Sequence, residues 1–491
     1  MVGEKVAPQY VGSEKGPTPK DVQAYARTHL NAKISYYKAW KGRKHAQSLI
    51  RGSPEQSFHL LPSYCYMLEK VNPGTITHIE VDGDNRFKYL FLAFGVAIKG
   101  FEFMRKVVGI DGTFLKSQYK GVLLVATAQD GNGQCYPIAW GIVDSENEDA
   151  WTWFLSKLKE VIGDSDELAF ISDMALSIKK AISNVIDKAH HGACAWHVSQ
   201  NVRNKFKCAD IMGSYWNAVN AYRIEDFKGY MIEISQRYPR VADYLENEVG
   251  FQKWSRCHFP GLMYNVKTMN MVESLNNMLV TAREFPYVAL LDVIQEKMSK
   301  WWNERRIVPM SLTSPLTPNR ENELRPCFTR SNGLLTIQLN PVTYQVKGGE
   351  IDAVVDIFNK KCSCKVFDID RLPCTHAIAA ALHARVGVYS LVSPYYTKEY
   401  YMLTYQQTIY PVGSQSQWDV PDEVVSWVVL PREVKDRKRG RPKNSRYPSA
   451  GEFRKRENRC GKCGQLGHYK KKCRSEVGST EGNPPTNVTA L

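Results

Sequence analysis

The stretch that decides the fold runs from Val107 to Leu155 and reads VVGIDGTFLKSQYKGVLLVATAQDGNGQCYPIAWGIVDSENEDAWTWFL. It opens with an apolar run that ends on a carboxylate, Asp111. A carboxylate beside buried strand residues costs free energy unless a hydrogen bond or a cation compensates its charge. The sequence therefore offers two interpretations of Asp111, a residue that caps a turn and a ligand of a metal ion.

The same stretch predicts three strands and a helix. Apolar runs at 103–113, 119–130 and 134–144 are typical of strands, and a glycine-rich turn at 130–133 separates the second from the third. From 147 the pattern changes to a helical period, with its apolar side chains on one face. Upstream, 77–95 predicts a hairpin. Downstream, 167–175 predicts a strand buried on both faces, and 176–186 a helix. This is the order of elements in an α/β fold of the RNase H-like type.

Composition describes a globular chain with one strongly basic region. The 491 residues are 43% hydrophobic and 23% charged, enough for a sizeable core. The N-terminus has no apolar signal region, and no apolar run approaches the roughly 18–20 residues of a membrane span. We therefore expect a soluble, intracellular protein without a membrane partner. Of the net charge of +15, the segment 432–474 contributes +13, with 17 Lys and Arg against 4 Asp and Glu. We therefore assign the basic character to the C-terminal tail. Three roles of this tail remain open: binding to phosphate groups, a nuclear import signal and a solvated linker.

Two aspartates follow apolar strand runs that we expect to be central in the sheet, Asp111 and Asp173. Either one alone is most simply a turn cap. Two neighbouring carboxylates repel each other unless a cation neutralises them, and Mg²⁺ prefers such oxygen ligands. Two bound ions can activate a nucleophile and stabilise a leaving oxygen in phosphoryl transfer. The pair in this order favours a metal site.

The third acid is chosen by the element that carries it. Glu273 lies in a predicted helix, whereas Glu146 and Glu148 precede the first helix of the α/β unit, so we prefer Glu273. Its separation from Asp173 is too long for a minimal domain and predicts an inserted helical subdomain at about 201–264.

Four stretches resemble the transposases of Mutator-like elements (MULEs), as found in plants: the opening stretch from GIDGTFLK onwards, FISD, HGACAWHVSQN and NMVESLNNML. The resemblance runs from about Gly52 through the C-terminal cysteine motifs. It implies an RNase H-like catalytic domain with a helical insertion. Residues that match the family's DDE triad, which cuts DNA and joins it to a target, are Asp111, Asp173 and Glu273.

The resemblance also leaves questions open. Cys194 and His197 match a Cys-x-x-His signature of the family. Their role is open between a pair that packs in the interior and a metal site. Relatives often have arginine where this chain has Met174, and they carry further N-terminal DNA-binding domains. These departures keep a truncated copy and a domesticated gene among the alternatives.

A first cysteine cluster predicts structural zinc. Its spacing, C-x-C, nine residues, then C-x-H, resembles the SWIM-type zinc finger that follows the catalytic domain in the same family. Three thiolates and an imidazole can close a tetrahedral zinc site. We expect a strand before the site and a helix after it. The predicted ligands are Cys362, Cys364, Cys374 and His376.

A second cluster has the C-x2-C-x4-H-x4-C spacing of a zinc knuckle, whose folding energy must come from the metal. The resemblance implies that it binds single-stranded nucleic acid. Its predicted ligands are Cys460, Cys463, His468 and Cys473. Ahead of it lies an AT-hook-like core, whose basic residues can enter a narrow A·T minor groove, although a basic linker or import signal stays open. Those residues are Arg439, Arg441 and Lys443.

These features divide the chain into seven parts. In order, we predict a disordered start (1–20), a helical region (21–75), the RNase H-like domain (76–310), the SWIM finger (340–390), the basic linker (432–459), the knuckle (460–474) and a disordered tail (475–491). The helical region either touches DNA or only packs.

The leading hypothesis is a nuclear DNA transposase that uses Mg²⁺ or Mn²⁺ at the acids and two structural zinc ions. We expect it to act as a homo-oligomer on element ends and target DNA. The alternative is a domesticated, catalytically silent DNA-binding regulator.

Overall fold

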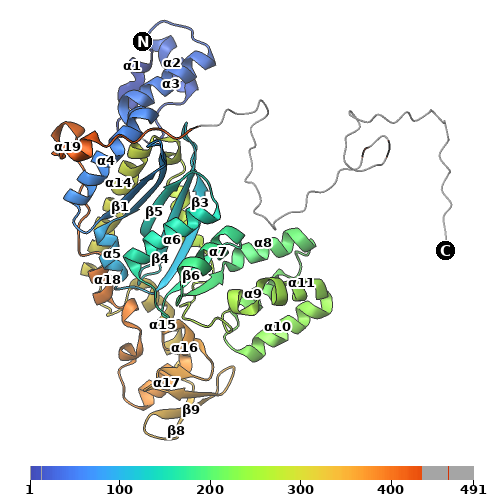
Figure 1. Ribbon diagram of the computed structural model, residues 1–491. Helices are drawn as coiled ribbons and strands as arrows, with labels where there is room; N and C mark the ends of the chain where they lie inside the picture. The colour runs from blue at the N-terminus through green and yellow to red at the C-terminus, as the bar shows by residue number, and fades with distance from the viewer. Residues whose placement is uncertain (1, 13, 434–459, 461–462, 464–491) are drawn as a thin grey trace. The chain divides into compact units, whose positions relative to one another are not determined.

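A computed structural model describes residues 2–12, 14–433, 460 and 463, and Figure 1 shows its elements. The chain divides into two compact units, 1–440 and 441–491. Only Cys460 and Cys463 of the second unit are described. The predicted AT-hook-like residues, the remaining knuckle ligands His468 and Cys473, and the predicted tail therefore lie outside the described residues. Every described helix and strand belongs to the first unit.

A seven-stranded mixed sheet forms the centre, with the order β1-β2-β5-β4-β3-β6-β7. The first five strands are antiparallel to their neighbours, whereas β6 runs parallel to β3 and β7 parallel to β6. The strands are β1 Ile76–Val81, β2 Phe87–Ala93, β3 Val107–Phe114, β4 Val122–Gln129, β5 Cys135–Val143, β6 Ala169–Ser172 and β7 His190–Ala193. The predicted hairpin and the four predicted strands from 103 to 175 are confirmed. Strand β7 was not predicted.

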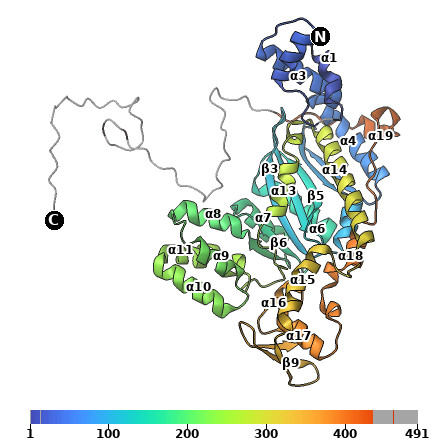
Figure 2. The same ribbon diagram turned by 180° about the vertical axis from the view of Figure 1, so that it is seen from behind.

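Helices cover both faces of this sheet, which explains why β4 and β5 are almost wholly apolar. Helices α6 and α7 lie on one face (Figure 1), and α13 and α14 on the other (Figure 2). Phe154 of α6 fits against Gly141 of β5, where an added Cβ would approach its ring to 2.7 Å. The helices around the sheet are α4 Pro54–Val71, α5 Gly95–Phe101, α6 Glu148–Ile162, α7 Leu176–Val185, α13 Asn270–Met278 and α14 Tyr287–Ile307.

A helical insertion follows β7. It has its own apolar core, separate from the core of the sheet, in which Trp254 and Tyr215 stack. The backbone N–H of Ala195 donates to the carbonyl of Lys267 over 2.9 Å, so the chain leaves and re-enters the sheet region at neighbouring points. The predicted insertion is present and begins earlier than expected. Its elements are α8 Ala195–Phe206, α9 Met212–Asn220, α10 Ile224–Arg237, α11 Pro239–Asp243, a π-helical turn η2 Tyr244–Val249 and α12 Phe251–Trp254.

The prediction of disorder for 1–20 is wrong for most of that segment. It contains α1 (Val2–Val6) and a 3₁₀ turn η1 (Ala7–Tyr10). Val6 and Tyr10 are buried in a small core with residues of the next helices. This order depends on packing against those helices, which a short segment without periodicity does not reveal. The helices are α2 Pro19–His29 and α3 Tyr36–Arg51.

The predicted finger region forms a second sheet of four strands, in the order β11-β10-β9-β8. A strand precedes its cysteines and a helix follows them, as predicted. Its elements are β8 Leu335–Gln338, β9 Thr343–Lys347, β10 Ala353–Asp356, β11 Lys361–Cys362, α16 Val366–Asp370 and α17 Thr375–His383.

Short elements complete the described chain. These are α15 Pro318–Ser331, α18 Lys398–Thr404, α19 Asp422–Ser426, and the 3₁₀ turns η3 Ala282–Glu284, η4 Val308–Ser311, η5 Val388–Leu391, η6 Pro394–Tyr396 and η7 Gln415–Gln417. None of the described helices combines the length and the apolar character needed to span a bilayer.

Candidate active site and zinc centre

The first two predicted acids are neighbours because of strand register. Parallel pairing of β3 with β6 sets Gly109 opposite Ile171. Asp111 and Asp173 each lie two residues beyond that pair, and residues two apart in a strand point to the same face of a sheet. Asp111 is half-buried and Asp173 is 6% exposed. Two carboxylates that are far apart in sequence thus belong to two adjacent central strands, Asp111 within β3 and Asp173 directly after β6.

Helix α13 brings the third predicted acid to the same face. It approaches β3 so closely that a Cβ at Gly109 would lie 2.8 Å from Met271 Cε, which explains the glycine. Further along the helix, Asn276 Nδ2 donates a hydrogen bond of 3.2 Å to Asp111 Oδ2. Glu273 lies three residues before Asn276 on this helix. The structure therefore carries the three acids on β3, after β6 and on the helix that covers them.

Asp173 also has a local structural role. Its Oδ1 accepts a hydrogen bond of 2.8 Å from the N–H of Ala175, at the start of α7. The hydroxyl of Ser172 lies 2.8 Å from His191 Nε2, which links this turn to β7. Burial lowers the pKa of His191 to about 3, and the charges of Lys253 and Lys179 add to the effect. His191 is therefore neutral at physiological pH.

The competing acids take different positions. Glu148 faces α7, where it accepts from Lys180 Nζ over 3.1 Å and from Asn184 over 3.5 Å. Glu146 lies against the other face of β3, since its carboxyl carbon would lie 3.2 Å from a Cβ at Gly112, which points away from the side chain of Asp111. These positions favour Glu273 over Glu148.

The Cys-x-x-His signature lies beside the acids. Cys194 follows β7, is fully buried, and its Sγ accepts from the backbone N–H of Met269 over 3.4 Å. Burial raises the pKa of this thiol, and the nearby charge of Glu273 also raises it. Cys194 thus ties the start of α8 to the segment that leads into α13. This contact favours a packed role over a metal site for Cys194 and His197.

Met174 fills the position where relatives often have arginine. Its sulfur lies 3.9 Å from Asn201 Nδ2 and 3.9 Å from the Tyr244 hydroxyl, both in the insertion. Here the residue after the second aspartate therefore contributes packing between the sheet and the insertion.

Arg283 is a neighbour of the acids that sequence reasoning missed. It lies in η3, and its guanidinium donates a hydrogen bond to Thr113 Oγ1, two residues beyond Asp111. Burial lowers the pKa of Arg283. No carboxylate lies within ion-pair distance of it among the residues that the structure describes. A half-buried arginine without an acidic partner is suited to bind a phosphate.

The predicted finger ligands come together in space. One ligand atom from each of Cys362, Cys364, Cys374 and His376 lies within 4.8 Å of the others. The Sγ atoms of Cys364 and Cys374 are 3.6 Å apart, and His376 Nδ1 lies 3.9 Å from Cys362 Sγ. Within the described residues, this is the one group of three or more His, Cys, Asp or Glu side chains whose ligand atoms lie this close together. The oxygen atoms of Asp111, Asp173 and Glu273 are therefore farther apart than the ligand atoms of the finger.

The surroundings of this cluster fit zinc. His376 Nε2 lies 3.2 Å from the carbonyl of Ile351, which favours the tautomer that leaves Nδ1 free to bind a metal. The N–H of Cys362 donates to Asp368 over 2.7 Å. Hydrogen bonds from the thiols of Cys362 and Cys374 hold the pKa of Cys364 far below its usual range. Thiol groups, one of them already favoured as a thiolate, beside an imidazole are the donor set that structural zinc requires.

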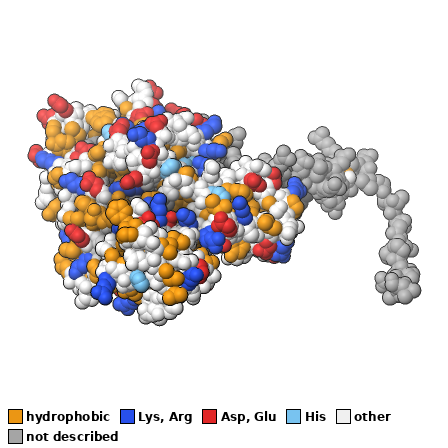
Figure 3. Space-filling model, turned by 90° about the horizontal axis from the view of Figure 1, so that it is seen from below, with side chains coloured by type: hydrophobic (Ala, Val, Ile, Leu, Met, Phe, Trp, Pro, Cys, Tyr) orange, Lys and Arg blue, Asp and Glu red, His pale blue; other side chains and the backbone are white. Residues whose placement is uncertain are grey.

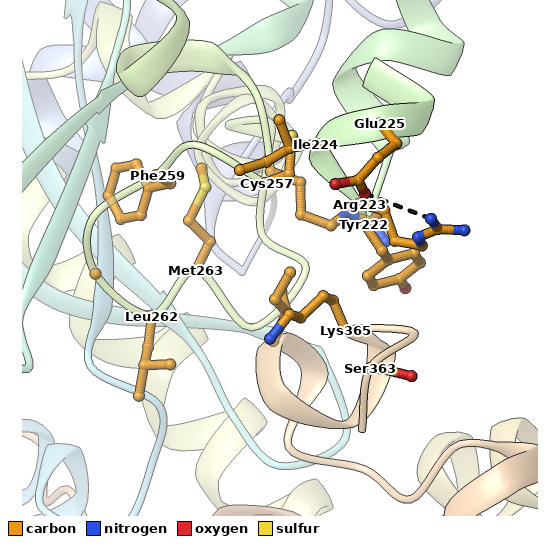
Figure 4. Close-up of a pocket in the computed structure, with 13 residues that line it drawn as sticks. Tyr222, Arg223, Ile224, Glu225, Cys257, Phe259, Leu262, Met263, Ser363 and Lys365 are labelled. Atoms are coloured by element: carbon orange, nitrogen blue, oxygen red, sulfur yellow. Dashed lines mark ion pairs between the residues drawn. The ribbon is translucent and has the colours of Figure 1, made fainter. Parts of the chain in front are cut away.

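A cavity of about 510 Å³ lies between the insertion and the finger (Figure 4). Tyr222 and Arg223 at the start of α10 face Ser363 and Lys365 of the finger across it. Beside it, the Tyr222 hydroxyl donates to Asp370 Oδ2 over 2.5 Å. The finger is thus joined to the insertion by a partly buried hydrogen bond.

Comparisons with known proteins agree with this architecture. Residues 107–201 match the family model of the MULE transposase domain, and residues 342–385 match that of the SWIM zinc finger. The chain is 24% identical over 181 residues to the transposase for insertion sequence element IS905 of Lactococcus lactis, which is 35% of this chain and 46% of that protein. It is 21% identical over 206 residues to FAR-RED IMPAIRED RESPONSE 1 of Arabidopsis thaliana, 42% of this chain and 24% of that protein.

A third relative, the transposase for insertion sequence element IS1201 of Lactobacillus helveticus, is 24% identical over 216 residues, 38% of this chain and 54% of that protein. The chain therefore spans about half or less of the length of the curated relatives that it matches. It contains a MULE transposase domain and a SWIM zinc finger. These matches support its place in the MULE-type transposase family.

Proposed function

We propose that this chain is a DNA transposase of the Mutator-like class that cuts and joins DNA at Asp111, Asp173 and Glu273. The observation that carries the proposal is the parallel register of β3 and β6, because Asp111 and Asp173 each follow the pair Gly109 and Ile171 by two residues. Helix α13, with Glu273, packs on β3 and on its neighbours β4 and β5. The matched MULE domain and the two insertion-sequence transposases support the same activity.

The order of the strands supports an RNase H-like catalytic domain. In β5-β4-β3-β6-β7, three antiparallel strands are followed by two parallel ones, and the first acid lies on the central strand. Strands β1 and β2 extend the sheet at the edge beyond β5. The insertion lies between the second and third acids in the sequence, and Met174, next to Asp173, packs against it.

The three carboxylates fit Mg²⁺ or Mn²⁺, because these ions take oxygen ligands. Bound ions would supply activation of the attacking oxygen and stabilisation of the leaving oxygen in phosphoryl transfer. Asn276 holds the Asp111 carboxylate in place through its hydrogen bond. We assign to Arg283 a contact with a backbone phosphate next to the reacting one.

The reaction has two steps. In the first, water attacks the phosphorus of a phosphodiester, the bond from phosphorus to the 3′ oxygen breaks, and a 3′ hydroxyl is released. In the second, this 3′ hydroxyl attacks a phosphodiester of the target, a new bond forms from phosphorus to oxygen, and a 3′ hydroxyl of the target is released. The acids hold the reacting group in both steps.

The remaining assignments complete this proposal. Zinc at the SWIM cluster stabilises the finger. We assign binding of double-stranded DNA to the basic segment with Arg439, Arg441 and Lys443. We assign binding of single-stranded nucleic acid to the knuckle, which a second zinc ion would hold folded. A nuclear location and a homo-oligomer that holds two element ends are part of the same proposal.

A silent DNA-binding regulator is the second candidate. The observation in its favour is the hydrogen bond from Ala175 to Asp173, because a turn cap explains this aspartate without catalysis. Cleavage separates the two. The full chain is incubated with supercoiled plasmid in Mg²⁺ or Mn²⁺, with EDTA as a control. The transposase predicts nicking that EDTA abolishes, whereas DNA binding without nicking under any metal would establish the regulator.

A further inference from the structure

Helices α2 and α3 carry a concentrated positive charge. From Pro19 to Arg51 there are 8 Lys and Arg against a single acid, a local charge of +7. The prediction that the basic character belongs to the C-terminal tail alone is therefore wrong. The net charge outside the tail is small, because acidic residues elsewhere cancel the positive charge of these helices. Basic and acidic side chains alternate on the face seen in Figure 3, which includes the finger and the insertion. The N-terminal helices differ from that face.

Helix α3 also exposes aromatic rings. Tyr37 is 61% exposed and Trp40 is 39% exposed. Their rings stack, with centroids 6.1 Å apart and planes 14° from parallel. Lys41 Nζ lies 5.0 Å from the centre of the Tyr37 ring, and Lys44 Nζ lies 6.0 Å from that of Trp40. These two aromatic rings do not pack in the core. They lie with the two lysines on one exposed stripe of the helix.

The core contact of α3 is made by small residues. Ala39 and Ala46 are its fully buried side chains, whereas Tyr36, Tyr37 and Lys38 at its start are all exposed. At 100° per residue, Tyr37, Trp40, Lys41 and Lys44 form one stripe, with Tyr36 and Lys38 on either side of it. The N-terminal half of the helix thus presents polar and basic groups over a wide arc.

The lysines of this arc lack acidic partners. Among the described residues, no ion pair includes Lys38, Lys41 or Lys44. The one acid of the region, Asp21, is hydrogen-bonded to Thr18 at the start of α2, at 2.7 Å from its hydroxyl. The positive charge of the arc is therefore available to an external polyanion.

The C-terminal end of α3, and α4 after it, reach the region around the end of the strand that carries Asp111. At the end of α3, the guanidinium of Arg51 lies 3.6 Å from the centre of the Phe285 ring. Glu55, at the start of α4, accepts hydrogen bonds of 2.9 Å from both Gln118 and Tyr119, in the loop that follows β3. The helix that carries the arc therefore leads, at its C-terminal end, to the loop that follows the strand of Asp111.

We propose that the exposed arc of α3 docks on the duplex DNA that the acids cut. The arc consists of Tyr36, Tyr37, Lys38, Trp40, Lys41 and Lys44. A major groove admits an α-helix and has phosphates on both walls, which matches basic and hydroxyl groups on both sides of the stripe. The inference rests on the proposed function, and it names the surface that holds the substrate.

Site-specific crosslinking tests the location without interference from the basic tail. Benzoylphenylalanine replaces Tyr36 in the full chain, and in a control it replaces Met310, which is 71% exposed on η4. Ultraviolet light is applied with a labelled duplex, or with one of its strands alone. The proposal predicts crosslinks from position 36 to the duplex and few from position 310. Stronger crosslinking to the single strand would overturn it in favour of a stacking platform.

Salt dependence tests the lysines. Removing three phosphate contacts in Lys38→Gln/Lys41→Gln/Lys44→Gln should lower the slope of log K against log salt by about 2 to 3, and weaken binding about tenfold or more. The matched control is Lys99→Gln/Lys188→Gln/Lys300→Gln, which removes the same charge at exposed sites elsewhere. Equal losses in both variants, or no loss in the first, would refute the docking surface.

Failure of this inference and failure of the proposed function give different results. The α3 variant should still nick plasmid when DNA is saturating, whereas Asp111→Asn should lose nicking and keep the crosslink from position 36. A wild-type chain that crosslinks but never nicks supports the surface and rejects the transposase. Equal melting temperatures of the variants establish that they are folded.

Discussion

The side-chain amide of Asn276 donates a hydrogen bond of 3.2 Å to Oδ2 of Asp111, and so joins the helix that carries Glu273 to the strand that carries the first acid. The two residues are 165 positions apart. This contact fixes one carboxylate relative to another, which a site for divalent ions requires.

Asn276→Ala should slow metal-dependent nicking by about 10- to 100-fold, because a carboxylate without its supporting hydrogen bond binds a metal less well. The measurement is the nicking rate as a function of Mn²⁺ concentration, and part of the loss should be recovered at high Mn²⁺. Asn277→Ala, on the exposed side of the same helix, is the control. An unchanged rate in Asn276→Ala would remove this residue from the site.

Cys374→Ser should release one zinc ion per chain. The four finger ligands lie within 4.8 Å of one another, and loss of one thiolate opens the tetrahedral site. Zinc content is measured by atomic emission on the purified chain, beside Cys327→Ser, a cysteine outside both clusters. Equal zinc in wild type and Cys374→Ser would show that this cluster does not hold the metal.

Tyr222→Phe should loosen the contact between the finger and the insertion. It removes the donor to Asp370, a carboxyl whose pKa is raised by burial, and leaves that group short of a partner. The cost is about 1–3 kcal/mol. Hydrogen exchange should become faster in α16 and at the start of α10, while β8 and β9 should stay protected. Unchanged exchange at both places would show that the hydrogen bond contributes little to docking.

Acid should destabilise the sheet through His191. Its pKa in the folded state is about 3, below the value near 6.5 of an unfolded histidine. The unfolded chain therefore binds the proton first as pH falls. The stability that neutral His191 provides is complete above about pH 6.5 and is lost towards pH 3, at up to about 1.4 kcal/mol per pH unit.

Thermal melting between pH 7.5 and 5 checks this. His191→Gln should show a shallower fall in melting temperature than wild type, because it retains a polar partner for Ser172 without a titrating ring. His59→Gln, at an exposed histidine of α4, should follow wild type. Parallel curves for wild type and His191→Gln would contradict the role assigned to burial.

The strands around the acids could be predicted because their signal is local. Apolar runs that end at Asp111 and Asp173 predicted β3 and β6, and the switch to a helical period predicted α6. The finger ligands could be predicted for the same reason, since all four lie within 15 consecutive residues.

Other features depend on contacts between distant parts of the chain. Strand β7 has the sequence HHGA and forms only by pairing with β6. Arg283 becomes a neighbour of the acids through Thr113, 170 residues away. Helix α1 is ordered by packing on α3, which composition does not show.

The most direct test of the central claim is plasmid nicking in Mn²⁺ by Asp111→Asn, Asp173→Asn and Glu273→Gln, with Glu148→Gln as the matched control. DNA binding and melting temperature are measured on each variant to show that it is folded. The account predicts that the first three variants lose nicking by several orders of magnitude while Glu148→Gln, whose carboxylate faces α7, keeps wild-type activity. Full nicking by Asp111→Asn would contradict the claim that β3 carries this aspartate in order to hold a catalytic ion.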